Sequence, residues 1–155
     1  MTLPEDIYSQ SILELAAAMP RTARLAMPQA TARAHSKLCG STVTVDLVME
    51  GDMVSDYGQS VKACLLGQSS ASVMGREIVG STAAELRAVG AAMRRMLKED
   101  GPPPYGKWGD LAVLEPVRDY KARHASTLLV FDAVEDAIAQ IEAKRAEAAR
   151  SEAHV

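Results

Sequence analysis

The feature that most limits the fold of this chain is a change in hydrophobic period at Cys64. Before it, from Gln29 to Ala63, apolar side chains recur at every second position, as they do on half-buried strands. After it, apolar side chains recur at helical spacing, and the clearest set is Leu86, Val89, Met93, Met96 and Leu97. Strands followed by helices predict an α+β fold, in which helices pack on one face of an antiparallel sheet.

Two short links divide the alternating region into three strands. We expect these strands over residues 29–37, 42–50 and 53–63. The first link, Leu38-Cys39-Gly40-Ser41, is a turn, and the second, Gly51-Asp52, is a hairpin signal. Gly58 is a candidate bulge in the third strand. Sequential strands with short links predict a three-stranded antiparallel meander.

Helices are expected on both sides of this strand region in the sequence. Before it lies an N-terminal helix, and after it the pattern predicts helices over 68–79, 82–97 and 108–114. The N-terminal helix covers 5–18, and a long C-terminal helix begins near Ser126. Beyond Glu142 the residues are those of a solvated helix end. We therefore expect one domain over residues 1–155, with 1–4 and 146–155 flexible.

The composition of the chain argues against several classes of protein. A net charge of −3 does not give the basic surface of a nucleic-acid-binding protein. No apolar run reaches the length of a membrane span, and the N-terminus has no basic and apolar segments of a signal peptide. The chain has two cysteines, and nothing points to secretion. We expect a cytoplasmic protein with free thiols and neither nucleic-acid nor membrane partners.

Cys39 and Cys64 are expected to lie near each other at one end of the sheet. The first strand runs into Cys39, the second runs back, and the third returns to Cys64. Cys64 also precedes a helix start, where unpaired N–H groups favour the thiolate, the form that binds metals. Alternatively, Cys64 is a small buried side chain beside the helix. No Cys-x-x-Cys pair is present, so a zinc finger is excluded.

The motifs of this chain resemble those of the U-type iron–sulfur cluster assembly scaffolds, which include the NifU N-terminal, IscU and SufU-like proteins. The matching segments are Cys39-Gly40-Ser41, Asp56-x-Gly58, Cys64 leading into Ser69-Ser70-Ala71-Ser72, Trp108-Gly109-Asp110-Leu111, and Arg123 to Ile138. Together they extend over roughly residues 5–140. The resemblance implies a scaffold or carrier that is not an enzyme. Such a protein receives sulfur from a cysteine desulfurase, holds a transient iron–sulfur cluster and passes it to recipient apoproteins.

The departures from the family lie at its ligand positions. The Asp of the family's Cys-Gly-Asp turn matches Ser41 here, and its third Cys matches Ser126. The resemblance therefore leaves Cys39 and Cys64 as thiolate ligands, beside two hydroxyls. A serine oxygen binds iron or zinc poorly unless it is deprotonated. Two thiolates are also fewer than the four that iron–sulfur clusters commonly use.

Several groups are candidates to complete the ligand shell. His124, two residues before Ser126, either approaches the site or is a solvated loop residue. His35 lies on one side of a strand, and Asp56 is either a ligand or a strand-edge charge. Alternatively, a homodimer brings four thiolates together around a [2Fe–2S] cluster.

Two other functions remain open from the sequence. The first is a zinc-binding sulfur-acceptor protein of the same fold, because zinc accepts mixed sulfur and nitrogen ligands. The second is an interaction protein that has kept the fold and lost the metal. The basic group Arg118, Lys121, Arg123 and His124 is either a solvated face or a docking surface for a partner.

Overall fold

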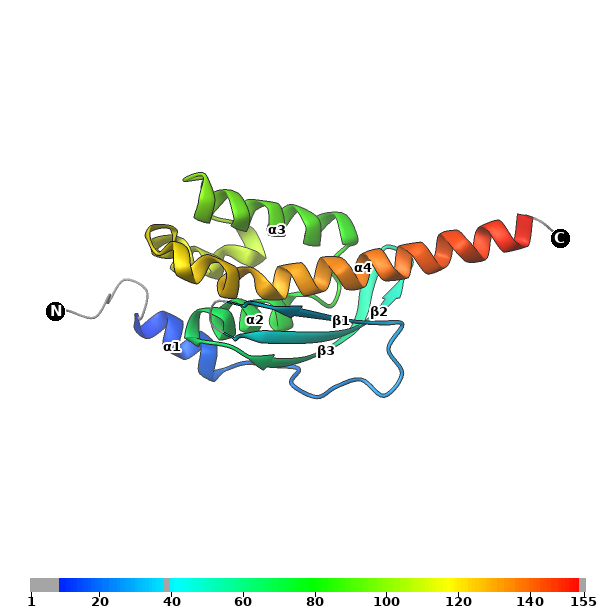
Figure 1. Ribbon diagram of the computed structural model, residues 1–155, viewed down its shortest axis with the longest axis horizontal. Helices are drawn as coiled ribbons and strands as arrows, with labels where there is room; N and C mark the ends of the chain where they lie inside the picture. Colours follow the sequence, from blue (N-terminus) through cyan, green and yellow to red (C-terminus); the bar gives the residue numbers. More distant parts are fainter. Residues whose placement is uncertain (1–8, 38–39, 154–155) are drawn as a thin grey trace.

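The computed structural model of the chain describes residues 9–37 and 40–153. Its elements follow the predicted α+β order, and the sheet has the predicted three antiparallel strands (Figure 1). The helices and strands are α1 (Gln10–Ala17), β1 (Ala30–His35), β2 (Thr42–Glu50), β3 (Met53–Lys62), α2 (Leu65–Glu77), α3 (Ala83–Lys98), the 3-10 helices η1 (Gly106–Asp119) and η2 (Lys121–Arg123), and α4 (His124–Ala153). Among the described residues, no helix combines the length and apolar character needed to cross a lipid bilayer.

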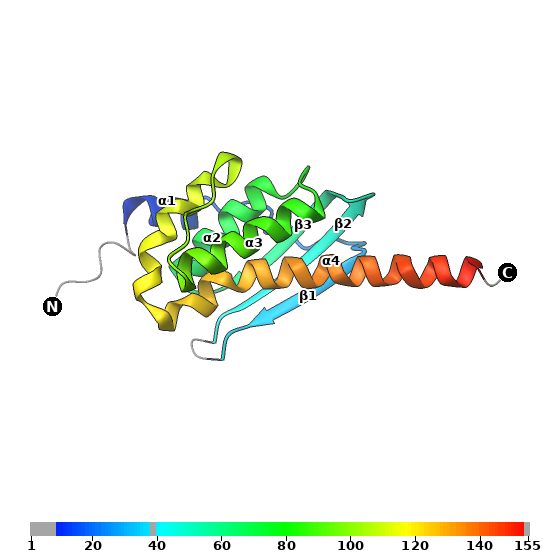
Figure 2. The same cartoon turned by 90° about the horizontal axis from the view of Figure 1, so that it is seen from above.

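The sheet has the order β1-β2-β3, and its register fixes which loops share an end. His35 of β1 pairs with Thr42 of β2, and Thr42 pairs with Lys62 of β3. The β1–β2 turn and the end of β3 therefore lie at the same end of the sheet (Figure 2). At the opposite end, Gly51 takes a φ of +63° in the β2–β3 hairpin, a backbone conformation that glycine adopts without strain.

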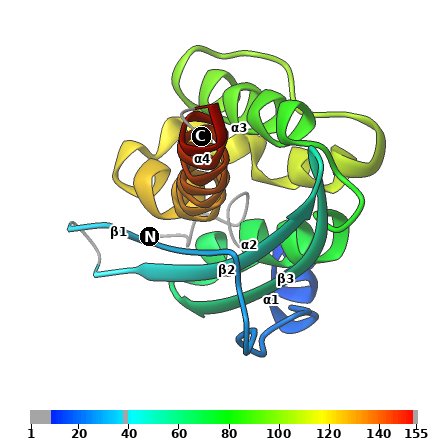
Figure 3. The ribbon, with the colours of Figure 1, turned by 90° about the vertical axis from the view of Figure 1, so that its right-hand side faces the viewer.

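One face of the sheet carries the helices. α2 and α4 lie directly on it, and α3 packs on α4 as an outer layer (Figure 3). The alternating apolar side chains of β2 face these helices, and all are buried: Val43, Val45, Leu47 and Met49. Helical spacing in the sequence also predicts a core face for the last helix, and its four residues Phe131, Val134, Ile138 and Ile141 are buried. Periodicity thus placed the core correctly.

The other face of the sheet is partly covered by the segment 18–29, which links α1 to β1. Gly58 allows this segment to lie close, because a Cβ there would be 2.3 Å from the Ala23 carbonyl oxygen. The expected bulge at Gly58 is wrong. The register instead shifts between Val48 and Met49, opposite Ser55 on β3. The small residue serves a close backbone contact rather than a bulge.

Several helix boundaries differ from the expected ones. α1 begins at Gln10, after its N-cap residue Ser9, rather than at residue 5. α2 begins at Leu65 rather than Gln68, because Cys64 is its N-cap residue. η1 spans Gly106–Asp119 with Pro116 inside it, beyond the expected range 108–114. α4 begins at His124 and continues to Ala153, exposed beyond Ile141. The flexibility expected for the C-terminal end stays a prediction.

The sequence Thr82-Ala83-Ala84-Glu85 at the start of α3 has the pattern of a capping box, and the structure contains half of it. Thr82 Oγ1 accepts the Glu85 N–H at 3.1 Å, as a helix cap should. The Glu85 carboxylate does not return to the cap; it accepts Trp108 Nε1–H at 2.9 Å and pairs with Lys107 Nζ at 2.9 Å. Glu85 therefore ties η1 to α3.

Candidate functional site

Cys64 lies where β3 ends and α2 begins. Its backbone is extended, with φ −66° and ψ 171°, and its carbonyl accepts the Gln68 N–H at 2.9 Å. The thiol makes no hydrogen bond to the first-turn N–H groups of α2 and is half-buried. It is therefore available to groups on neighbouring elements.

The thiol of Cys64 meets Ser126 on the first turn of α4. Cys64 Sγ lies 2.9 Å from Ser126 Oγ, although the two residues are far apart in the sequence. Ser126 is buried, with 1% of its surface exposed. Ser126, which matches the family's third cysteine, therefore lies in direct contact with Cys64.

Gly67 makes this contact possible. A Cβ at Gly67 would lie 2.8 Å from Ala63 Cβ and 3.0 Å from the Ser126 carbonyl oxygen. Both distances are shorter than ordinary van der Waals contacts, so a side chain here would push α2 away from α4. The small residue after Cys64 therefore sets the distance between the two helix starts.

The described residues on either side of Cys39, Ser36 and Ser41, lie at the same end of the sheet as Cys64. Cys39 itself is outside the described residues, so its predicted closeness to Cys64 stays a prediction. The described part of the turn is hydrogen-bonded: Gly40 N–H donates to the Ser36 carbonyl oxygen at 2.9 Å, and Ser36 N–H to the Ser41 carbonyl oxygen at 2.9 Å. Ser41 is buried and directly precedes Thr42, the partner of Lys62. Ser41 is thus near this end of the sheet.

Asp56 is not brought to Cys64. It pairs with Val48, six positions along β3 from Lys62, or about 20 Å at strand spacing. Its Oδ1 lies 3.6 Å from Arg21 Nη1. The structure therefore separates this candidate ligand from the thiol, because both lie on one extended strand.

The two candidate histidines are engaged elsewhere. His35 is exposed on β1, with Nδ1 2.9 Å from Thr42 Oγ1. His124 is buried at the start of α4 rather than solvated in a loop, so the solvated-loop alternative is wrong. Its Nε2 lies 3.0 Å from the Val117 carbonyl oxygen and 3.1 Å from that of Arg118. Because a carbonyl only accepts, Nε2 carries a proton there and is not free to bind a metal.

Three residues of the basic group, Arg118, Lys121 and His124, line a hollow of about 550 Å³. Its walls are Leu97, Lys98, Asp100, Arg118, Lys121, His124 and Ala125. Arg118 is partly neutralised, since it pairs with Glu115 at 3.1 Å and Asp100 at 3.6 Å. Partner docking at this surface stays a prediction.

Within residues 9–37 and 40–153, no three His, Cys, Asp or Glu side chains are grouped as a metal site. Cys64 and Ser126 together supply one thiol and one hydroxyl. This pair by itself does not make the ligand shell of zinc or of an iron–sulfur cluster.

Comparison with known proteins gives the family. No family model matches the chain. The crystal structure of a nitrogen-fixing NifU-like protein (N-terminal) from Brucella abortus is 61% identical, with a TM-score of 0.89, and the match covers 90% of this chain and 97% of that one. The chain belongs to the U-type family of iron–sulfur cluster assembly scaffolds.

More distant relatives agree with this membership. The iron-sulfur cluster assembly scaffold protein IscU of Thermotoga maritima is 23% identical over 135 residues, which is 87% of this chain and 94% of that protein. A putative SufU scaffold from Fervidobacterium islandicum AW-1 shares the fold, with a TM-score of 0.80 at 21% identity; the match covers 88% of this chain and 99% of that one.

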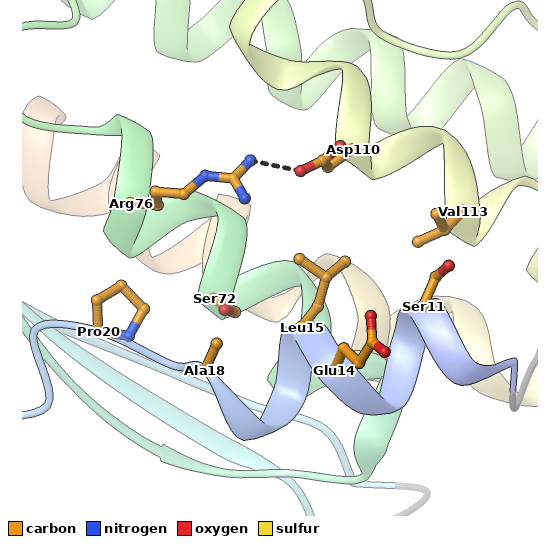
Figure 4. A pocket seen from close by; sticks show the side chains of 9 residues that line it. All are labelled: Ser11, Glu14, Leu15, Ala18, Pro20, Ser72, Arg76, Asp110 and Val113. Carbon is orange, nitrogen blue, oxygen red and sulfur yellow. Dashed lines mark ion pairs between the residues drawn. The ribbon is translucent and has the colours of Figure 1, made fainter.

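This U-type protein also has a groove that the sequence did not indicate. The groove, of about 380 Å³, lies between α1, α2 and η1 (Figure 4). Arg76 Nη2 pairs across it with Asp110 Oδ2 at 2.9 Å. Hydrogen bonds from its guanidinium to Glu77 and Asp110 raise the pKa of Arg76 above its ordinary value. Arg76 lies about 18 Å along α2 from Cys64, so this groove is separate from the thiol.

Proposed function

We propose that this U-type scaffold binds an iron–sulfur cluster as its cargo through Cys39 and Cys64 and passes it to recipient apoproteins. The observation that supports this most is the position of Cys64. Its half-buried thiol lies at a helix start, in contact with Ser126 and at the end of the sheet where Thr42 pairs with Lys62. Thiolates are the usual ligands of such clusters.

Sulfur arrives from a cysteine desulfurase in this proposal. The thiolate of Cys39 or Cys64 attacks the outer sulfur of a cysteine persulfide on the desulfurase, so that a new S–S bond forms while the old one breaks and the desulfurase cysteine leaves as a thiolate. A two-electron reductant such as a dithiol then releases this sulfur as the sulfide of the cluster. The chain then acts as a carrier and not as an enzyme in its own right.

Two protomers together supply the missing thiolates. Each chain has two cysteines, so a two-fold dimer supplies the four that a [2Fe–2S] cluster commonly uses. Ser41 and Ser126 then lie beside the cargo, and their hydroxyls are weaker ligands than thiolates. The dimer needs no ligand from Asp56, in agreement with its place on β3, and none from His124.

Anaerobic reconstitution with ferrous iron and sulfide tests this function. The wild-type protein should show charge-transfer absorbance, equal iron and sulfide contents, and one [2Fe–2S] cluster per dimer by native mass spectrometry. Cys39→Ser and Cys64→Ser should each abolish the cluster and the dimer. Lys62→Ala, which alters an exposed side chain near Cys64, is the matched control and should behave as wild type.

Other outcomes of the reconstitution would favour one of the two alternative functions. Zinc uptake without iron–sulfide uptake would favour the zinc-binding sulfur acceptor. No metal uptake, with partner binding unaffected by either Cys→Ser change, would favour the interaction protein. A monomer that holds a complete cluster would contradict the shared site.

A further inference from the structure

We infer that Ser126 donates a hydrogen bond to the Cys64 sulfur and positions that sulfur for the cargo, and that Ser126 is not itself a ligand. The inference rests on the proposed function, because the sulfur in question is the one that holds the cargo. A cysteine at this position would bind the cargo through its own thiolate. Ser126 instead supports the Cys64 sulfur that binds the cargo.

The direction of the hydrogen bond follows from burial. Ser126 is 1% exposed, and within the described part of the chain Cys64 Sγ is the one hydrogen-bond partner of its Oγ. A buried hydroxyl proton without an acceptor is costly, so this proton points at the sulfur. The S–H proton of Cys64 does not need the Ser126 hydroxyl as its acceptor, because Cys64 is half-buried and its thiol can donate to solvent water.

The neighbouring residue on α4 shows the usual alternative. Thr127 is also buried, and its hydroxyl donates to the Arg123 carbonyl oxygen at 2.8 Å, one turn back along the helix. Ser126 does not use the corresponding carbonyl of its own helix and bonds across to α2 instead. Its hydroxyl is therefore committed to the contact between the two helix starts.

The arrangement also separates the roles of hydroxyl and sulfur. Ser126 lies in the interior while Cys64 is partly exposed, so cargo that arrives from solvent meets the sulfur first. Gly67 holds α2 close to Ser126, which keeps the hydroxyl against the sulfur. To bind iron, the hydroxyl would have to lose the proton that it donates. Hydrogen bonds to ligand sulfurs instead tune the reduction potential of iron–sulfur clusters.

Three proteins test the inference after anaerobic reconstitution: wild type, Ser126→Ala and the control Thr127→Val. The control removes an adjacent buried hydroxyl that does not contact Cys64. Ser126→Ala should bind as much iron and sulfide as wild type, but its reduction potential should become more negative. Pulsed electron paramagnetic resonance of the reduced samples in D₂O should show one exchangeable deuteron coupling lost in Ser126→Ala and kept in Thr127→Val.

Each other result overturns the inference in a distinguishable way. Loss of iron in Ser126→Ala would make Ser126 a ligand. An unchanged potential with an unchanged deuteron signal would mean that no hydrogen bond reaches the sulfur. If wild type takes up no cluster, the proposed function fails and the inference fails with it. Ser126→Ala leaves no buried polar group without a hydrogen-bond partner, because the Cys64 sulfur can interact with solvent water, so the variant is expected to fold. Should it not fold, a wild-type sample without any exchangeable deuteron coupling overturns the inference by itself.

Discussion

Asp46 on β2 is a buried carboxylate that fixes the segment 18–29 to the outer face of the sheet. Its Oδ1 accepts from Thr31 Oγ1 at 2.6 Å and from Arg24 Nη2 at 3.0 Å. Its Oδ2 accepts from Arg24 Nε at 2.5 Å and from the Leu25 N–H at 3.0 Å. All four donors lose their acceptor if Asp46 is replaced by Ala.

The structure sets the size of this effect. Arg24 is half-exposed and Thr31 is exposed, so both can turn to water in Asp46→Ala. The Leu25 N–H loses its acceptor and a small cavity forms, so we expect a loss of about 3 kcal/mol in the free energy of unfolding. For a domain of this size, that corresponds to a fall of roughly 6–12 °C in Tm.

The effect should depend on pH with a definite sign. Desolvation of the buried carboxylate raises its pKa, but the hydrogen bonds from Arg24, Thr31 and Leu25 and the charge of Arg24 outweigh this. The pKa of Asp46 therefore lies below its ordinary value. A lowered pKa gives stability that is present above about pH 4 and is lost as pH falls through the pKa of the folded state. The difference between wild type and Asp46→Ala should shrink in acid.

Urea unfolding at about pH 7 and about pH 2.5 measures this difference. The control is Asp56→Ala, which removes an exposed carboxylate from the neighbouring strand and should change stability by less than about 0.5 kcal/mol. A loss below about 1 kcal/mol in Asp46→Ala at neutral pH would refute the reasoning. So would a difference that stays constant down to the lower pH.

Three further substitutions test the packing around the thiol and around η1. Ser126→Cys should raise the affinity for zinc, measured by competition with a chelator, because it adds a thiolate beside Cys64; unchanged affinity would mean a closed pocket. Gly67→Ala should cost about 1–3 kcal/mol in urea unfolding because its Cβ meets Ser126, and full stability would contradict that contact. Glu85→Gln should change the fluorescence of Trp108, the single tryptophan, at a cost below about 1 kcal/mol, and unaltered fluorescence would exclude the bond between them.

Much of the fold could be predicted because its signals are periodic. Alternation gave the three strands to within two residues, and helical spacing gave the buried faces of α3 and α4. Single-residue signals were less reliable. Pro116, for example, lies inside η1, which continues to Asp119.

The outer face of the sheet was harder to predict. Asp46 alternates with the apolar residues of β2, a pattern typical of a solvated strand face. It is buried because the segment 18–29 covers it, and no periodic feature in that segment signals such a cover. A carboxylate that faces Arg24 across 22 positions of sequence is a tertiary contact, which periodicity does not encode.

The site shows the same division between local and tertiary information. The helix start at Cys64 has a local signal, and the small residues from Gly67 to Ser72 leave room for another backbone to come close. Which backbone it is follows from the fold: the Gly67 position faces the Ser126 carbonyl, so the first turns of α2 and α4 meet there. A hydroxyl at position 126 then has two possible roles: it binds the cargo directly, or it donates a hydrogen bond to the Cys64 sulfur that binds the cargo. Its burial behind a half-exposed thiol favours the second role, because a donor needs only to stay in contact with the sulfur, whereas a ligand must reach the metal.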